Sequence, residues 1–528
     1  MTPGEGGDLS TIPAVLHRGA ERYGELEAVV DGATRVSFAE LEARVEAVAR
    51  ALIASGVDAG DRVAIWAPNS LEWIVASFAI YSTGAVLVPL NTRFRGNEAG
   101  HVLRTSQAKL LFTVTDFLDT DYVELLQGVD GLDALEEIVV WQGPVPATAT
   151  AWATFAERAA TTPPASVTER EAALGPRSVS DIIFTSGTTG APKGAMLGHG
   201  ASVDTYVEWS SLVGLRRGDR YLVVYPFFHT AGLKSGVLAS VLTGSTIVPH
   251  AVFDVPSLVG RVAEERITML PGPPAVFQTI LNDPAIRRAE LSTLRLAVTG
   301  AASVPVELIE RMRFELPFET IVTGYGLTET TGTVSMCRHD DPPEVIANTV
   351  GRPLPGIEVR LVDDDGRDAP AGGAGEIIVR GYNVMQGYFN DPAATAAAID
   401  AEGWLHTGDV GVIDDGGNLR ITDRKKDMFI VGGFNAYPAE IEGIMLGHPG
   451  IAQVAVIGVP DDRMGEVGMA FVVARHGVPL DPAELIGWCR ERMANFKVPR
   501  NVEVVDALPL NPSGKVMKFV LRDRAAGS

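Results

Sequence analysis

The chain carries TSGTTGAPKGA at residues 185–195, directly behind the apolar run DIIF at residues 181–184. An apolar run followed at once by glycines and hydroxyl side chains is typical of a strand that ends in a ligand loop. A Walker-type phosphate loop is excluded, because that motif has glycine before its lysine and Pro192 has no backbone N–H to offer there. Hydroxyl groups, close backbone approach and a lysine charge still suit a phosphate. We therefore expect phosphate contacts, with a surface turn as the alternative, from Ser186, Gly187, Thr188, Thr189, Gly190 and Lys193.

The surroundings of this loop repeat one pattern between residues 181 and 330. Short β-rich apolar runs alternate with Gly/Pro/Ser/Thr turns and with stretches of helical spacing such as residues 306–316. This alternation is expected of a mostly parallel sheet covered by helices. In such sheets ligands bind beyond the carboxyl ends of the strands, so one site could collect several of these ends. The expected strands are 182–185, 221–225, 246–249, 267–270, 294–298 and 320–322.

The rest of the chain divides around this region. Residues 30–115 show a similar alternation and are expected to form a related first subdomain, while residues 143–167, rich in Pro, Ala and Thr, read as a connection. The fold class is therefore α/β, with a large N-terminal domain (1–423) of stacked mixed and parallel sheets with helices and a small α+β C-terminal domain (424–528). The smaller domain is expected to hold strands 453–459, 469–474 and 501–505 and helices 438–446 and 482–493.

Composition limits the function. A formal net charge of -22 would repel nucleic acid and argues against a polyanionic partner. Only Cys337 and Cys489 are present, which fits a reducing compartment. The N-terminus has no basic and apolar signal, and the apolar stretch 73–90 is interrupted by polar residues and predicts a buried helix, a turn and a strand rather than a membrane span. We expect a soluble, cytoplasmic protein, and an oligomer is compatible with the sequence.

Five motifs follow one another along the chain: TSGTTGAPKG (185–194), YGLTE (325–329), HTGD (406–409), ITDRKKDMFIVGGFN (421–435) and PLNPSGK (509–515). They resemble the motifs of the adenylate-forming superfamily, which contains acyl-CoA synthetases, adenylation domains of peptide synthetases and firefly luciferases. Their order and spacing make the resemblance specific, and it covers essentially the whole chain. It implies an ATP-dependent enzyme that uses Mg²⁺ to form an acyl-AMP and then passes the acyl group to coenzyme A.

This resemblance implies the residues that hold ATP. The loop would wrap the β- and γ-phosphates, with Thr185 near the Mg²⁺ that Glu329 holds, and a carboxylate beside phosphate oxygens suits this hard cation. Tyr325 would stack on adenine and Thr328 would contact the α-phosphate. Taken singly, each could be an ordinary core or surface residue. The adenine side would be completed by Gly300 and Ala301, and the ribose hydroxyls would be gripped by Asp409 and Arg424.

The resemblance also implies a mobile C-terminal domain. Lys515 would bridge the substrate carboxylate and the α-phosphate, because an attack between two anions needs a cation. Lys426 would be the hinge about which the domain rotates between the two half-reactions, although a charged linker has the same sequence. Gly432 and Gly433 would leave room for the thin pantetheine arm of CoA.

The acyl pocket is expected beside the ATP site. His229 would gate the pocket or contact the substrate, and its alternative is a buried, hydrogen-bonded core histidine. Lys234 could meet a keto or carboxyl oxygen of the substrate, or its apolar stem could carry the charge out to solvent. The expected lining is Phe228, His229, Lys234, Gly324, Thr330 and Thr333.

Further stretches resemble CoA ligases of actinobacterial steroid catabolism, which implies a bicyclic keto acid, methylhexahydroindanedione propanoate, as substrate. The alternatives are a ligase for medium-chain or for cyclic and aromatic carboxylates, and an adenylation enzyme that loads a carrier protein. A non-catalytic nucleotide-binding module is disfavoured because Glu329 and Lys515 are both present. The stretches are FFHTAGLKSG (227–236), PHAVFD (249–254), LPGPPAVFQTIL (270–281) and TGAASVPVELIERM (299–312).

Overall fold

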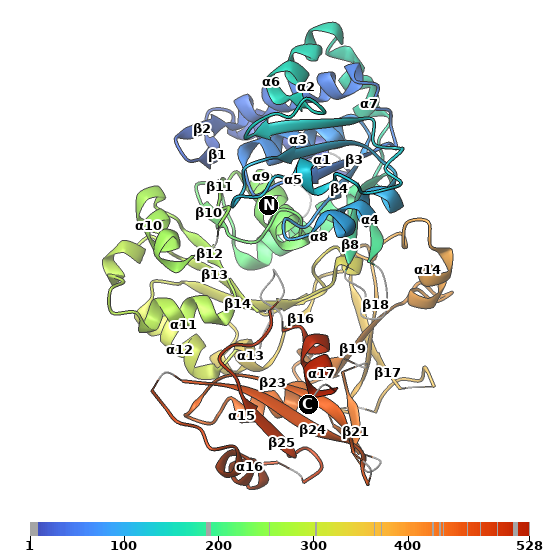
Figure 1. Cartoon of the computed structure of the whole chain (residues 1–528). Helices are drawn as coiled ribbons and strands as arrows, with labels where there is room; N and C mark the ends of the chain where they lie inside the picture. The colour runs from blue at the N-terminus through green and yellow to red at the C-terminus, as the bar shows by residue number, and fades with distance from the viewer. Residues whose placement is uncertain are drawn as a thin grey trace.

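Figure 1 shows a computed structural model of the chain. For residues 289, 423, 424, 430, 434 and 435 it describes the backbone only. The described residues are 9–185, 192–252, 254–300, 304–363, 365–370, 372–424, 427–431, 434–436, 438–461, 463–475, 477–493, 495–510 and 516–526.

The first large sheet has seven strands in the order β7-β6-β5-β3-β4-β8-β9. Its neighbours pair in parallel except β8 and β9, which are antiparallel. The central strands are apolar on both faces, as expected where helices cover a parallel sheet. The strands are β3 Arg62–Trp66, β4 Val86–Pro89, β5 Ala108–Val114, β6 Glu137–Gln142, β7 Thr150–Ala151, β8 Val179–Thr185 and β9 Lys193–Gly198.

The second large sheet has nine strands in the order β16-β15-β14-β13-β12-β10-β11-β1-β2. The run from β1 to β14 in this order is parallel, and β2, β15 and β16 are added antiparallel at its two edges. The strands are β1 Glu27–Asp31, β2 Thr34–Ser37, β10 Arg220–Val223, β11 Thr246–Pro249, β12 Met269–Pro271, β13 Leu296–Thr299, β14 Thr320–Tyr325, β15 Ser335–Met336 and β16 Arg352–Pro353.

The predicted strands exist, but their division between sheets corrects the sequence analysis. Strand β8 belongs to the seven-stranded sheet, while the other five runs expected beside it lie in the nine-stranded sheet. Conversely, β1 and β2 from the N-terminal region join the nine-stranded sheet rather than a separate first subdomain. An apolar run predicts that a strand is buried, but the partner depends on contacts far away in sequence.

The N-terminal helices pack around these sheets, and one buried apolar cluster includes residues of both. α3 is buried at every position except Glu72, so the prediction of a buried helix, a turn and a strand over residues 73–90 is confirmed. The helices are α1 Ile12–Tyr23, α2 Phe38–Ala54, α3 Leu71–Ser82, α4 Gly96–Ser106, α5 Tyr122–Leu125, α6 Trp152–Glu157, α7 Ala165–Ala172, α8 His199–Val213, α9 Ala239–Thr243, α10 Val255–Glu265, α11 Pro274–Asn282, α12 Val306–Glu315 and α13 Pro343–Asn348, with the 3₁₀ turns η1 Arg158–Thr161, η3 Arg288–Leu291 and η4 Thr328–Thr330 and the π-helix η2 Ala231–Leu238.

Two smaller sheets follow along the chain. The antiparallel sheet β17-β18-β19-β20 consists of Glu358–Val362, Gly375–Arg380, Leu405–Ile413 and Leu419–Arg424, and α14 (Pro392–Ala398) precedes β19. The last sheet has the order β22-β21-β24-β23, with β25 parallel to β24. Its strands are β21 Phe429–Val431, β22 Phe434–Ala436, β23 Ile451–Asp461, β24 Gly465–Ala474 and β25 Asn501–Val504, accompanied by α15 Pro438–Met445, α16 Pro482–Arg490 and α17 Lys518–Ala526.

The apolar cores change between these two sheets. The cluster that fills the N-terminal part reaches Leu419, and a separate cluster begins at Phe429. In Figure 1 the elements after β20, coloured orange to red, gather at one end of the molecule. This change of core supports the expected boundary at residues 423–427, which itself stays a prediction.

Two smaller expectations have clear outcomes. The expected C-terminal strands and helices are confirmed to within a few residues at their ends, and α12 buries Leu308, Ile309 and Met312 as its spacing predicts. The expectation that residues 143–167 form a plain connection is wrong, because α6 and the 3₁₀ turn η1 fold there and Phe155 is fully buried.

In the described part of the chain, no helix combines the length and the apolar character that a membrane crossing requires.

Candidate active site

The ends of two strands from different sheets meet at the candidate site. Thr185 is the last residue of β8, and Glu329 lies in η4, the 3₁₀ turn that follows β14. The Thr185 hydroxyl donates to Glu329 Oε1 at 3.3 Å, so the residues expected to lie near Mg²⁺ are close together. Lys193 begins β9 and is the ladder partner of Thr185. Residues 186–190 of the expected phosphate loop lie outside the described residues.

The turn that carries Glu329 is fixed by its own sequence. The Thr330 hydroxyl accepts a hydrogen bond from Leu327 N at 2.9 Å, and the next residue adopts a left-handed conformation with φ 55°. Gly326 is required because a Cβ there would lie 2.3 Å from Gly332 O. Thr330 is fully buried and its hydroxyl fixes the turn, so its expected place in the wall of the acyl pocket stays a prediction. Thr333 is also buried, and its carbonyl accepts from the Asn383 amide at 2.8 Å.

The expected adenine and ribose residues also meet. The Tyr325 hydroxyl, at the end of β14, donates to Asp409 Oδ2 at 2.6 Å across to β19. Asp409 is buried, and the preceding Gly408 has φ 69° and donates its N–H to Glu376 Oε1 at 3.2 Å. Arg424 is the ladder partner of Asp409, and its side chain lies outside the described residues. A carboxylate beside an aromatic ring suits a nucleoside, because ribose hydroxyls donate to the one and a base stacks on the other.

Two glycines lie where β13 and β14 end. Gly300 has φ 153°, and a Cβ on it would lie 3.8 Å from Gly324 O. Gly324 is itself tight, because a Cβ there would come within 3.1 Å of Met336. At Gly300 and Gly324 the protein therefore presents backbone rather than side chains. This suits the close approach of a flat ligand. Ala301 lies outside the described residues.

His229 lies in the turn between β10 and η2. Its backbone N–H donates to Pro226 O at 3.0 Å, and its Nδ1 accepts from Ala231 N at 3.3 Å. The side chain is exposed, so the alternative of a buried core histidine is wrong. Desolvation by the surrounding protein lowers the pKa of the imidazole, which favours the neutral form. Its role in gating or substrate contact stays a prediction, as does that of the half-buried Phe228.

The helix after His229 is a π-helix, a rare form that is frequent at functional sites. Its glycines allow it to lie directly on its neighbours, since a Cβ on Gly232 would come within 2.2 Å of Pro226 O and one on Gly236 within 2.5 Å of Val223. Lys234 in this helix is only 1% exposed. The alternative that its charge reaches solvent is therefore wrong.

The Lys234 ammonium group binds a buried carboxylate instead. Its Nζ lies 2.5 Å from Asp181 Oδ2 in β8, and the Tyr81 hydroxyl donates to Oδ1 of the same carboxylate at 2.5 Å. Burial lowers the pKa of Lys234, and Asp181 opposes this effect. The charge that the sequence analysis offers to a substrate oxygen is thus compensated inside the protein.

Sequence reasoning misses two functional candidates, and four residues that it predicts lie outside the described part of the chain. Asp181 and Tyr388 show no periodicity or motif of their own, and they are recognised only by the contacts they make. Lys426, Gly432, Gly433 and Lys515 lie outside the described residues, so their roles stay predictions.

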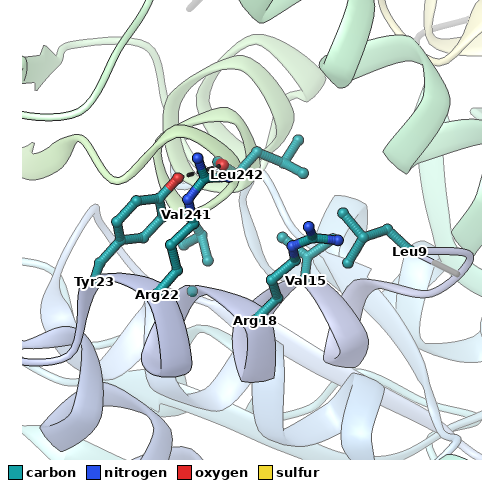
Figure 2. A pocket seen from close by; sticks show the side chains of 8 residues that line it. Leu9, Val15, Arg18, Arg22, Tyr23, Val241 and Leu242 are labelled. Atoms are coloured by element: carbon teal, nitrogen blue, oxygen red, sulfur yellow. Dashed lines mark hydrogen bonds between the residues drawn. The ribbon is translucent and has the colours of Figure 1, made fainter. Parts of the chain in front are cut away.

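A small hollow lies between α1 and α9, near the Tyr23 hydroxyl, which donates to Leu242 O at 3.2 Å (Figure 2). Its volume is about 10 Å³. This volume is about that of one water position, so it cannot hold a substrate. None of its lining residues belongs to the predicted site.

Family comparison agrees with the arrangement of strand ends. Residues 16–389 match the model of the AMP-binding enzyme family, and residues 440–515 match the model of the AMP-binding enzyme C-terminal domain. The chain belongs to the AMP-binding enzyme family.

Similar proteins include two ligases with the same name, 3-[(3aS,4S,7aS)-7a-methyl-1,5-dioxo-octahydro-1H-inden-4-yl]propanoyl:CoA ligase. The protein of Rhodococcus jostii is 48% identical over 97% of this chain and 98% of its own length. The protein of Mycobacterium tuberculosis is 48% identical over 98% of this chain and 99% of its own length. Among solved structures, the anthranilate CoA ligase AuaEII in complex with anthranoyl-AMP is 26% identical, covers 100% of this chain and 99% of its own, and has a TM-score of 0.88.

Proposed function

We propose that the protein is an ATP-dependent acyl-CoA ligase for a bicyclic keto acid with a propanoate side chain. In the first half-reaction the carboxylate attacks the α-phosphate of ATP and gives acyl-AMP and pyrophosphate. In the second the CoA thiol attacks the acyl carbon and gives the thioester and AMP. The observation that carries the proposal is the hydrogen bond between Thr185, at the end of β8, and Glu329, in the turn after β14. The hydrogen-bonded pair of Tyr325 and Asp409 lies near this contact, since Tyr325 ends β14.

The donor set fits Mg²⁺. Glu329 and Thr185 offer a carboxylate and a hydroxyl, the oxygen ligands that this cation prefers. No cluster of three or more His, Cys, Asp or Glu side chains able to hold a metal occurs in the described ranges. Mg²⁺ is usually bound by one or two carboxylates together with water and substrate phosphates. Bound there, the cation would supply Lewis-acid neutralisation of phosphate charge.

The chain's own residues would divide the remaining work. Thr185, Lys193 and the loop between them would hold the phosphates that leave, and Thr328 would contact the α-phosphate. Asp409 and Arg424 would hold the ribose while Tyr325 stacks on the base, so that the α-phosphate is fixed in front of the acid. Lys515 would hold the two anions together.

The proposal of a bicyclic substrate is based on the names of two relatives, both of which are called ligases for a methyl-dioxo-octahydroindenyl propanoate. Phe228, His229 and Gly324 would border its pocket. A C-terminal domain of residues 424–528 would rotate about Lys426, and Gly432 and Gly433 would admit the pantetheine arm. The use of ATP and CoA fits a cytoplasmic enzyme.

A panel of acids tests the proposal. The protein is incubated with ATP, Mg²⁺ and CoA and with the bicyclic propanoate, a medium-chain fatty acid or an aromatic acid, and pyrophosphate and thioester are quantified. We expect the highest kcat/KM for the bicyclic acid. Formation of AMP without consumption of CoA for every acid would refute the assignment as a CoA ligase. A higher kcat/KM for another acid would refute only the assignment of the bicyclic substrate.

A further inference from the structure

Tyr388 touches two residues of the candidate site at once. Its hydroxyl donates to Glu329 Oε1 at 2.9 Å, and the Lys193 Nζ lies 5.3 Å from the centroid of its ring. We propose that Tyr388 is a positioning residue that holds the Glu329 carboxylate for the divalent cation and Lys193 for the phosphates of ATP. This inference rests on the proposed function, because it assigns Tyr388 a part in that same site.

The backbone around Tyr388 ties together the two elements that it supports. Residue 388 forms an isolated β-bridge with Ala195 of β9, and the adjacent Phe389 N–H donates to Gly194 O at 2.8 Å. Three residues earlier, the Met385 N–H donates to the backbone carbonyl of Glu329 at 2.8 Å. The segment therefore links η4, which lies between β14 and β15 of the nine-stranded sheet, to β9 of the seven-stranded sheet. Glu329 belongs to the first of the two linked elements and Lys193 to the second.

The orientation of the ring is fixed from the other side. Gly387 has φ 128°, and a Cβ there would come within 2.7 Å of Thr395 Cγ2 in α14. The Thr395 hydroxyl also accepts a hydrogen bond from Tyr388 N at 2.9 Å. Glycine at 387 thus allows α14 to pack against the segment and to fix the direction in which Tyr388 leaves the chain.

The two hydroxyl contacts explain what Tyr388 adds. Among the described residues, the hydroxyls that reach the Glu329 carboxylate are those of Tyr388 and Thr185, and both donate to Oε1. Donors on one oxygen set the plane of the carboxylate and thereby direct its other oxygen. Outer partners of this kind typically change metal affinity by 10- to 100-fold when removed. The ring contributes separately, because its face attracts the ammonium group of Lys193.

Two substitutions separate these contributions. Tyr388→Phe removes the hydroxyl and keeps the ring, whereas Tyr388→Leu removes both. The matched control is Tyr382→Phe, because Tyr382 lies six residues away in the same segment and its hydroxyl donates to Pro355 O at 3.1 Å, with no contact to Glu329. Thermal unfolding of each variant shows whether the fold is kept.

The readout is the affinity for Mn²⁺ in the presence of a non-hydrolysable ATP analogue. Binding is measured from the decrease of the EPR signal of free Mn²⁺. We expect Tyr388→Phe to raise the Kd of Mn²⁺ about tenfold and to leave the affinity for the analogue alone unchanged. Tyr388→Leu should weaken both. In a Glu329→Gln background, Tyr388→Phe should add no further loss, because the two residues act as one unit.

Three outcomes would overturn the inference. The first is a Mn²⁺ affinity of Tyr388→Phe equal to that of the unaltered protein, and the second is an equal loss in Tyr382→Phe. The third is that the unaltered protein does not bind Mn²⁺ with the analogue and does not form acyl-AMP. This outcome would overturn the proposed function as well. Mn²⁺ binding and acyl-AMP formation by the unaltered protein, together with an unaffected Tyr388→Phe, would overturn the role of Tyr388 alone.

Discussion

At the scale of single residues, the ion pair between Asp181 and Lys234 places two opposite charges inside the core. Both side chains are at most 1% exposed, and Ser180 Oγ also lies 2.5 Å from Asp181 Oδ2. Burial of two charges is offset only when their geometry and further hydrogen bonds are good. The pair links β8, which leads to Thr185, with the π-helix that follows His229. It therefore connects the strand that leads to the expected phosphate contacts with the helix that borders the expected acyl pocket.

We expect Lys234→Met to destabilise the protein by about 3–5 kcal/mol, because it leaves the Asp181 carboxylate buried without its cation. The double variant Lys234→Met/Asp181→Asn should recover most of this loss, since no buried charge remains. Urea unfolding followed by tryptophan fluorescence measures the difference. The control is Lys109→Met, because the ion pair of Lys109 with Asp61 is about a quarter exposed and should cost less than about 1 kcal/mol. Equal costs at the two lysines would contradict this account.

At the scale of secondary-structure elements, local pattern and long-range pairing differ in what the sequence reveals. The run 246–249 predicts β11 to the residue, because burial along one strand is a local property. The sheet to which β8 belongs depends on its pairing with β4, where Leu87 opposes Asp181, and no local pattern encodes it. The same limit applies to the site: motifs predict Thr185 and Glu329, whereas Tyr388 reaches Glu329 across 59 residues and Tyr81 reaches Asp181 across 100.

Three helices are joined by one histidine. His17 in α1 contacts Glu171 of α7 through Nε2 at 2.8 Å and Glu42 of α2 through Nδ1 at 2.6 Å. The hydrogen bond to Glu171, followed by that to Glu42, outweighs burial and raises the pKa of His17 from 6.5 to about 9. A raised pKa stabilises the fold fully below the unfolded value of 6.5, and this contribution is lost as the pH rises through about 9.

We therefore expect the difference in Tm between the unaltered protein and His17→Gln to be largest below pH 6.5 and to vanish above pH 9. Because the His17 side chain is 48% exposed, the difference should correspond to no more than about 1 kcal/mol. Glu171→Gln should remove more of this pH dependence than Glu42→Gln, since Glu171 is the larger cause and the less exposed partner. A Tm difference that is constant from pH 6 to pH 10 would refute the assignment.

At the scale of the whole molecule, the proposed reaction requires one site to serve two steps. The Thr185–Glu329 junction lies beside Phe184 and Tyr325, which pack against the larger apolar core, whereas an apolar cluster that begins at Phe429 is separate from it. A part with its own core can move as a unit without unpacking the other. Lys515 lies in the part that would move, so its charge would be present for adenylation and absent for thioester formation.

We expect Lys515→Ala to lower acyl-AMP formation by at least about 100-fold, because the attack of a carboxylate on a phosphate loses the cation that stabilises its transition state. Thioester formation from supplied acyl-AMP should stay close to that of the unaltered protein. Pyrophosphate release measures the first half-reaction, and mass spectrometry of the thioester measures the second. Lys497→Ala is the control, since this lysine of the same C-terminal part pairs with Glu440 at 2.5 Å. An equal loss in both half-reactions would contradict a role confined to adenylation and, with it, the rotation of the C-terminal part between the two steps.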